Sequence, residues 1–397
     1  MFLQRKSDSG SDRQAGRMGL RLFHTVTGIA AAFFLLPLFP LFSNTARAVP
    51  QFDARFGATV MPGHETHGEP SYGMACGDCH INPTGGGLRT QHGREVMLDL
   101  LPMVKKDHAE FEEMISWSRN VAIGGDFRFM YLHSQPESTA SLQNAFFPMQ
   151  SDLYIAVSPT DQLTLYLQDG RGGPREYFGL FQKLPYNAYF KFGRFIPPYG
   201  LKLDDHTSFI REKLQLGALD QDAGVEAGFV KGHFFGHAAA INGNPGSERD
   251  DNDKKGFSGT AGFRSPHLTL GGSYYVNHGL DDERTYAGGY AMAHLGPISW
   301  LGEWDSVRVS DLNLDTKTTG SALYQEINFA PLNGIVLQLK YDRYDEDTVS
   351  DNELQRVTAG LDLYPYPYTE VLVQYRRNLE DPELGNDQWL VMMHLFF

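Results

Sequence analysis

The sequence predicts a mainly β protein, an antiparallel transmembrane β-barrel of about 16 strands that follows a small N-terminal segment. First, runs of about ten residues alternate apolar and polar side chains from residue 119 to 397. Second, the connections between these runs alternate long and short, as bacterial barrels require. Third, mean hydropathy is −0.35 although 13% of the residues are aromatic, a combination that suits an outer-membrane barrel.

Residues 1–48 are predicted to be a signal peptide. Basic residues between Arg5 and Arg21 precede an apolar stretch at 26–42 and the A-x-A cleavage signal Ala46-Arg47-Ala48. This signal is expected to direct export of the chain from the cytoplasm and to be cleaved after Ala48. The net charge of −14 argues against a nucleic-acid partner.

Residues 49–118 contain the motif C-x-x-C-H, formed by Cys76, Cys79 and His80. These are the only two cysteines of the chain. The spacing is that of a c-type haem attachment site, in which both thiols bind the porphyrin and the histidine coordinates the iron. The chain has no second C-x-x-C to complete a zinc site, and no surrounding βαβ pattern favours a thioredoxin-like pair. A short structural disulfide stays open in an exported protein.

The residues after the motif are expected to support one covalent haem c. Arg89 is a candidate partner of a haem propionate, because its planar guanidinium suits carboxylates, although an ordinary surface charge is an equal alternative. The run Gly85–Gly87 would let the backbone approach the haem edge closely. A helix is expected from about Gly93 to Trp117. So short a region is expected to need the haem or a host to pack against, so it is predicted to plug the barrel lumen.

The distal ligand of the haem iron stays open, with His92 and Met97 as the leading candidates. His92 follows the glycine run, and Met97 lies on the expected helix. Ligand identity sets the reduction potential, and a methionine raises it. The remaining candidates are His64, His67, Met74 and Met103. For each of these residues, an exposed or packing role is the alternative.

The region 119–397 is the predicted barrel. Clear strands are Leu163–Gln168, Ile335–Asp342, Glu370–Arg376 and Trp389–Phe397. A soluble β-sandwich also alternates, so the connection lengths decide for the barrel. The expected periplasmic turns are at 159–162, 184–187, 232–233, 265–267, 296–297, 330–334 and 364–368. The expected extracellular loops are at 133–144, 169–175, 196–223, 243–255, 278–284, 310–317, 345–354 and 379–386.

Two kinds of loop carry candidate functional residues. Acidic residues at 345–353 and 380–387 offer oxygen ligands that suit divalent cations and would concentrate such ions; solvated loops that keep the barrel soluble are the alternative. In the longest loop, four residues are expected to constrict the pore or to meet the haem region: Asp204, Asp205, His206 and Arg211.

The motif Cys76–His80 with its flank Asn82–Gly87 resembles the fused monohaem cytochrome–porins, outer-membrane cytochromes of the Fe(II)-oxidising type. The segment Gly193–Gly200 is similar to a barrel segment of phosphate-selective-type porins. The resemblance implies a haem at the periplasmic side or in the lumen of an outer-membrane barrel. It implies an extracellular electron donor such as Fe(II) and a periplasmic c-type cytochrome as partners.

Three functions are therefore carried forward. The first is electron transfer across the outer membrane through one haem; whether such a chain is an Fe(II)-oxidising enzyme or a carrier depends on its donor. The second is the barrel component of a larger multihaem conduit. The third is a diffusion porin whose C-x-x-C forms a disulfide. No Ser-His-Asp arrangement or carboxylate pair supports hydrolysis.

Overall fold

The computed structural model describes a compact unit that falls within Thr45–Phe397. The described residues are 76–99, 101–104, 116–118, 120–134, 144–171, 173–247, 249–265, 267–349, 353–379 and 385–397. The predicted signal peptide and the candidate ligands His64, His67 and Met74 lie outside them.

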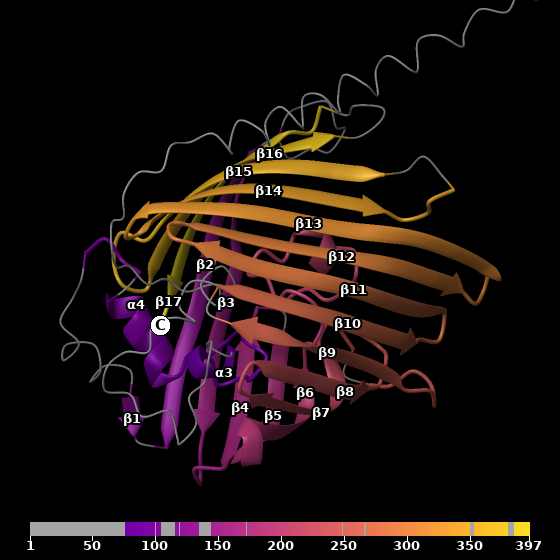
Figure 1. The fold of residues 1–397 in the computed structure, drawn as a ribbon, viewed down its shortest axis with the longest axis horizontal. Helices are drawn as coiled ribbons and strands as arrows, with labels where there is room; N and C mark the ends of the chain where they lie inside the picture. The colour runs from indigo at the N-terminus through magenta and orange to yellow at the C-terminus, as the bar shows by residue number, and fades with distance from the viewer. Residues whose placement is uncertain are drawn as a thin grey trace, which may run out of the picture. The chain divides into compact units, whose positions relative to one another are not determined.

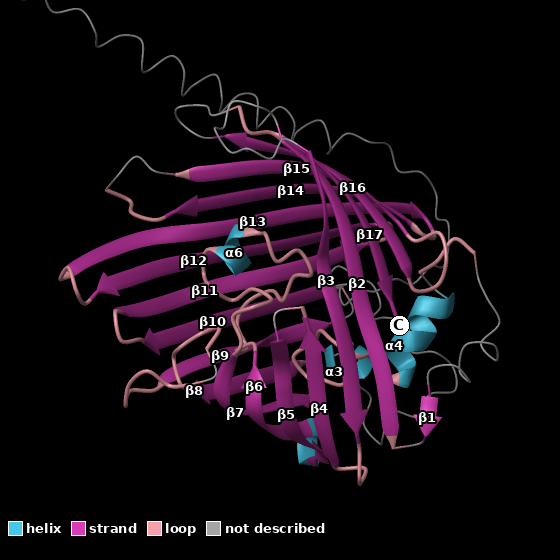
Figure 2. Cartoon of the chain, turned by 180° about the vertical axis from the view of Figure 1, so that it is seen from behind, coloured by secondary structure: helices cyan, strands magenta, loops and turns pink. Residues whose placement is uncertain are grey.

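The predicted fold class is confirmed: strands β2 to β17 form a closed antiparallel barrel of 16 strands (Figures 1 and 2). Each strand pairs with its neighbours in sequence, and β17 closes the ring on β2. The strands are β2 (Val121–Ser134), β3 (Asn144–Val157), β4 (Leu163–Gly170), β5 (Gly173–Leu184), β6 (Ala188–Phe195), β7 (Asp222–Lys231), β8 (Phe234–Ile241), β9 (Gly256–Ser265), β10 (Leu268–His278), β11 (Asp282–Leu295), β12 (Ile298–Asp311), β13 (Thr316–Leu332), β14 (Ile335–Asp345), β15 (Leu354–Leu363), β16 (Thr369–Leu379) and β17 (Gln388–Phe396).

The predicted alternation is confirmed, and its two faces have opposite character. On β4, Leu165 and Leu167 are exposed, whereas Thr164, Tyr166 and Gln168 between them are buried. The other strands follow the same rule, with Leu, Phe and Val outside and many charged side chains inside. An apolar exterior around a polar interior is typical of a transmembrane barrel. No helix in the described part of the chain is long and apolar enough to cross a membrane.

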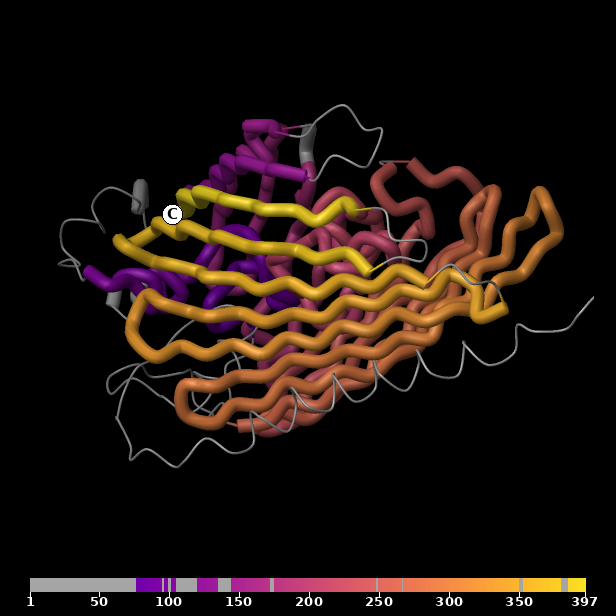
Figure 3. The backbone as a smooth tube through the Cα atoms, turned by 90° about the horizontal axis from the view of Figure 1, so that it is seen from above, coloured from indigo at the N-terminus to yellow at the C-terminus, as the bar shows by residue number. Residues whose placement is uncertain are grey.

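The strands are joined mostly as predicted, and Figure 3 shows consecutive strands running side by side as hairpins. Short turns at Gly232-His233 and Gly296-Pro297 fall between the strands where they were expected. Three connections that were expected to be long are short. The one at 169–175 is a tight turn, because β4 extends to Gly170 and β5 starts at Gly173. Those expected at 278–284 and 310–317 comprise only residues 279–281 and 312–315, because the flanking strands extend further than predicted.

The longest connection, residues 196–221, contains helix α6 (Phe209–Glu212), which packs against the barrel strands β13 and β14 (Figure 2). Phe209 and Ile210 of this helix are buried. Backbone N–H of Phe209 also donates to Asp342 on β14 at 3.0 Å. The loop therefore folds against the inner face of the barrel.

The segment before the barrel contains helices α3 (Cys76–Cys79) and α4 (Gln91–Asp99) and the short strand β1 (Ser116–Ser118), which pairs with β2. The expected helix at Gly93–Trp117 is therefore wrong in its extent. Pro102 disfavours helical geometry in the residue before it, so the helix ends at Asp99. Val96 and Leu101 pack in one apolar cluster with Phe396 of β17, whereas Met103 and Val104, which were expected on the same helical face as Val96, are exposed.

Candidate functional site

The C-x-x-C-H motif forms a small, hydrogen-bonded unit. Cys76 and Cys79 bound the single turn of α3, and the N–H of His80 donates to the Cys76 carbonyl at 2.9 Å. The chain then reverses, so that His80 forms a bridge with Arg89. Thr90 N–H donates to the Cys79 carbonyl at 2.9 Å. These bonds hold both cysteines and the histidine in one place without any contribution from the barrel.

The glycine run after the motif allows two close contacts. All three glycines have positive φ, between 65° and 88°, a backbone region that glycine reaches without steric cost. A Cβ on Gly85 would lie 3.3 Å from the Cβ of Cys76, and one on Gly87 would lie 2.1 Å from the hydroxyl of Tyr166 on β4. The run thus brings the backbone against the motif on one side and the barrel wall on the other.

Polar contacts join this segment to side chains on the inner wall of the barrel. Asn82 is fully buried and accepts a hydrogen bond from Lys191 Nζ at 3.2 Å, while its amide donates to Glu176 at 3.4 Å. Tyr166 Oη accepts from the N–H of Leu88 at 3.3 Å. Lys191 also pairs with Glu226 at 2.9 Å, and both side chains are wholly buried. None of these barrel residues was singled out from the sequence.

A cavity of about 330 Å³ lies between the motif, the loop 196–221 and the barrel wall. Cys76, Cys79 and His80 all line it. The thiols of Cys76 and Cys79 are not joined in a disulfide. Two thiols and a histidine open to one cavity are the donor set that a c-type haem requires, so these residues fit the group.

The environment of His80 favours its neutral form, which can bind a metal ion. Burial, reinforced by the charges of Arg89 and Lys202, lowers the pKa of His80 to about 3. The imidazole is therefore neutral, which is the form that ligates metals. Its Nδ1 is buried and has no hydrogen-bond partner of acceptable geometry among the described residues.

Arg89, the predicted partner of a haem propionate, also lines the cavity. Its guanidinium lies over the ring of Phe396 at 4.5 Å. Nε and Nη1 are buried, and neither has a hydrogen-bond partner among the described residues. Two buried donors without acceptors are costly, and an anionic group in the cavity would satisfy them.

Of the predicted distal ligands that the structure describes, only Met97 lines the cavity. Its side chain is buried within a small apolar cluster with Val96 and Phe396. His92 is not among the lining residues, and Met103 is exposed. Sequence reasoning missed three further lining residues whose nitrogen or sulfur could bind iron: His237, Met292 and His394. All three occupy positions on β-strands, and period-two alternation was the signal that could have placed them inside.

His394 belongs to a buried polar cluster with two carboxylates. Its Nδ1 lies 2.6 Å from Glu370, and its Nε2 lies 2.9 Å from Asp126. Asp204 of the long loop comes close to Glu370 and His394, a grouping that could in principle hold a metal ion. Both ring nitrogens already have carboxylate partners, however, and Asp204 pairs with Arg128 at 2.5 Å. The cluster is therefore satisfied by ion pairs.

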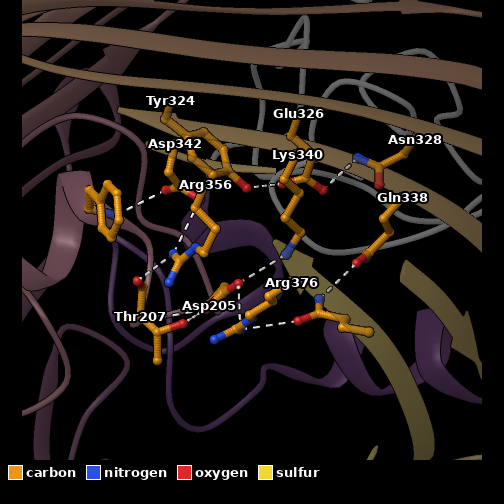
Figure 4. A network of polar contacts seen from close by, with 12 residues as sticks. Asp205, Thr207, Tyr324, Glu326, Asn328, Gln338, Lys340, Asp342, Arg356 and Arg376 are labelled. Atoms are coloured by element: carbon orange, nitrogen blue, oxygen red, sulfur yellow. Dashed lines mark hydrogen bonds and ion pairs between the residues drawn. The ribbon is translucent and has the colours of Figure 1, made fainter. Parts of the chain in front are cut away.

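The long loop meets the cavity, as expected, through Asp204, His206 and Arg211. Asp205 does not point there: it pairs with Lys340 at 3.1 Å and Arg376 at 3.4 Å on the barrel wall (Figure 4). Burial alone would raise the pKa of Asp205, but the surrounding cations, Lys340 first, outweigh it and hold that pKa well below its ordinary value. The loop is thus anchored to the barrel wall by charge.

The acidic loops that were expected to attract cations are only partly described. Asp345 pairs with Arg343 at 3.6 Å, and Glu353 pairs with the same guanidinium, which lowers the attraction of both carboxylates for a free cation. Residues 380–384 lie outside the described chain.

No known family profile and no curated protein matches this sequence. Solved structures with the same fold are outer-membrane porins. A loop L8 deletion mutant of OmpT, an outer membrane protein of Vibrio cholerae, aligns at a TM-score of 0.57 with 12% identity, over 70% of this chain and 99% of that one. Salmonella typhi OmpF, in a complex with daunomycin, aligns at 0.55 with 12% identity, over 70% and 98%. An anion-selective porin from Comamonas acidovorans aligns at 0.52 with 11% identity, over 70% and 99%. The likeness shows the porin fold.

Proposed function

We propose that this chain is an outer-membrane barrel that transfers electrons through one c-type haem, held by Cys76, Cys79 and His80. The single observation that carries the proposal is that both thiols and a neutral imidazole line one cavity against the barrel wall. When bound, the haem would supply a one-electron couple at its iron. The donor would be extracellular, such as Fe(II), and the acceptor a periplasmic c-type cytochrome.

The chain's own residues would fix the position and the surroundings of the haem. The hydrogen bonds of Asn82 and Leu88 to the barrel would hold the attachment segment in the lumen as a plug. Arg89 would compensate a propionate with its two buried donors. The loop 196–221, anchored through Asp205, would cover the cavity. Cover by this loop would limit water access to the haem, which tunes the reduction potential.

The test is a visible spectrum of the full chain, purified in detergent from cells that attach haem c. The proposal expects one haem per chain in a pyridine haemochrome assay, reduction of that haem by added Fe²⁺, and loss of haem in the Cys76→Ala/Cys79→Ala double variant. A barrel that folds but carries no haem would overturn the proposal. A haem that Fe²⁺ does not reduce, but a multihaem cytochrome does, would identify the chain as one component of a larger conduit.

A diffusion porin is the second candidate, because the solved neighbours are porins and one is named as anion-selective. The inner wall of the barrel carries buried arginines such as Arg128, Arg175 and Arg194, and positive side chains in a lumen favour anions. Single-channel recording separates this function from the first. A haem-free chain that conducts steadily in a planar bilayer would support the porin.

A further inference from the structure

We infer that Nε2 of His237, on barrel strand β8, is the second axial ligand of the haem iron held by His80. The inference rests on the proposed function, since it requires haem at Cys76 and Cys79. It assigns the distal ligand to the barrel wall rather than to the segment that carries the attachment motif. The inner face of β8 presents Phe235, His237 and Ala239, and the first two line the cavity.

The hydrogen bonds around His237 fix its tautomer. Tyr189 on β6 donates its only hydroxyl proton to Glu226. The same hydroxyl oxygen lies 2.8 Å from Nδ1 of His237. Because its only proton is already donated to Glu226, this oxygen can only accept a hydrogen bond from Nδ1. Nδ1 therefore carries the proton, and the lone pair resides on Nε2. Metal-binding histidines are oriented in the same way, by an acceptor that takes a hydrogen bond from the other ring nitrogen.

The other ring nitrogen, Nε2, is left without a hydrogen-bond partner among the residues that the structure describes, and the ring lines the cavity. The ring is also held in place by aromatic neighbours, with Tyr189 at 5.7 Å and Phe235 at 5.9 Å between centroids. Gly228 on β7 leaves room for it, since a Cβ there would lie 2.5 Å from Nδ1. A donor with a fixed ring and a defined lone pair is preorganised for a metal.

The residues that orient His237 are connected to the haem-attachment segment. Glu226, which accepts from Tyr189, pairs with Lys191 at 2.9 Å. Lys191 in turn donates to Asn82 at 3.2 Å, two residues beyond His80. One buried chain of contacts thus links the orienting group of His237 to the residues that follow the motif.

The rival donors are less suited. Both nitrogens of His394 already contact carboxylates. His92 does not line the cavity, and Met97 packs in the apolar cluster with Val96 and Phe396. His206 lies on the long loop, and no described residue forms a hydrogen bond that would fix its ring. His237 alone among the described candidates combines a wall position, an orienting partner and a ring nitrogen without a hydrogen-bond partner.

The test compares ferric spectra of the purified haem-loaded full chain. The wild type is expected to be low-spin and unchanged by added imidazole. His237→Ala is expected to keep its haem, to become high-spin, and to return to low-spin when imidazole is added. Met97→Leu and His92→Gln serve as matched variants and should keep the wild-type spectrum. A low-spin spectrum in His237→Ala, or a change to high-spin in Met97→Leu or His92→Gln, would overturn the assignment.

Tyr189→Phe keeps the assignment testable if His237→Ala fails to fold. Removal of the acceptor of Nδ1–H makes the imidazole a weaker donor, so the variant should remain low-spin while its reduction potential rises. An unchanged potential would contradict the role of His237. Absence of haem from the wild type would instead refute the proposed function, so the two failures are distinguishable by the haemochrome assay.

Discussion

Asn82 and Lys191 illustrate how single polar side chains join the attachment segment to the barrel. Lys191 is wholly buried, yet its ammonium meets Glu226 at 2.9 Å and Asn82 at 3.2 Å, and it lies over the rings of Phe178 and Phe195. A buried charge is tolerated only when it is paired and hydrogen-bonded. Through these contacts, Lys191 connects the attachment segment to the barrel wall.

Lys191→Met is expected to destabilise the barrel, because it leaves Glu226 buried without a cation. Breaking a buried pair in this way costs about 3–5 kcal/mol. Lys254→Met is the control, since its pair with Glu283 is exposed and such pairs contribute at most about 1 kcal/mol. Equilibrium unfolding in denaturant, with the chain in detergent, measures both. An equal loss of unfolding free energy in Lys191→Met and Lys254→Met would contradict the stabilising role of the buried pair.

Gly87→Ala is expected to weaken the docking of the attachment segment. The new Cβ would meet Tyr166 Oη, and the Tyr166 ring is stacked on Phe178 at 4.7 Å, so it has little freedom to move. Gly232→Ala is matched, because Gly232 also has positive φ but has nothing within 4 Å of the added Cβ. Overpacking should cost about 1–3 kcal/mol beyond the shared backbone strain. Denaturant unfolding in detergent compares the two variants, and a similar loss in both would refute a docking role for Gly87.

At the scale of elements, the loop 196–221 lines one side of the cavity, and ion pairs hold this loop against the barrel wall. Asp205 meets Lys340 and Arg376, and the carbonyl of Thr207 accepts from Arg356 at 2.7 Å. Helix α6 adds the buried apolar side chains of Phe209 and Ile210. The loop is thus fixed to the barrel wall by both polar and apolar contacts.

The anchoring of this loop should persist into acid. Because the folded pKa of Asp205 is depressed, its contribution is fully present above the unfolded pKa of about 3.9 and is lost only as pH falls well below that value. Wild-type protein should therefore resist pepsin in this loop near pH 4 and become sensitive only at lower pH.

Asp205→Asn should make the loop sensitive to pepsin already near pH 4, because it leaves Lys340 and Arg376 buried without their carboxylate. Asp250→Asn is the matched control, since Asp250 pairs with Lys255 in a different, exposed loop. Mass spectrometry of the fragments locates the cut. Resistance of Asp205→Asn equal to that of the control would show that the charges do not hold the loop.

At the scale of the whole molecule, the barrel separates an apolar exterior from a charged interior. Val391 and Met393 of β17 face outward, whereas Met392 and His394 face inward. Closure by β17 on β2 leaves no free sheet edge among the barrel strands, which is what a lipid environment demands.

Val391→Arg is expected to destabilise the folded barrel in a bilayer by about 2–4 kcal/mol if Val391 lies near the membrane midplane. Leu314→Arg is the control, because Leu314 is exposed in the turn between β12 and β13. Folding into lipid vesicles, followed by the mobility shift of unheated samples on gels, gives the stability of each. An unaffected Val391→Arg variant would argue that this face does not contact lipid.

Much of this architecture was predictable because it repeats along the chain. Period-two alternation placed Leu165 outside and Gln168 inside, and the turns at Gly232-His233 and Gly296-Pro297 followed from their residue types. The expected loop at 169–175 and the extent of the helix after Gly93 were wrong, since strand pairing and Pro102 decided those boundaries. Boundaries depend on neighbours that are distant in sequence.

The sequence by itself determined the barrel class and the donors Cys76, Cys79 and His80, because strand periodicity and C-x-x-C-H spacing are local patterns. Only the tertiary structure decided what faces those donors. Lys191 and His237 lie more than 100 residues away from the motif, and strand register brings Lys191 against Asn82 and His237 to the cavity that the motif lines. Register is set by pairing around the whole ring, so no local pattern encodes the wall that the motif meets.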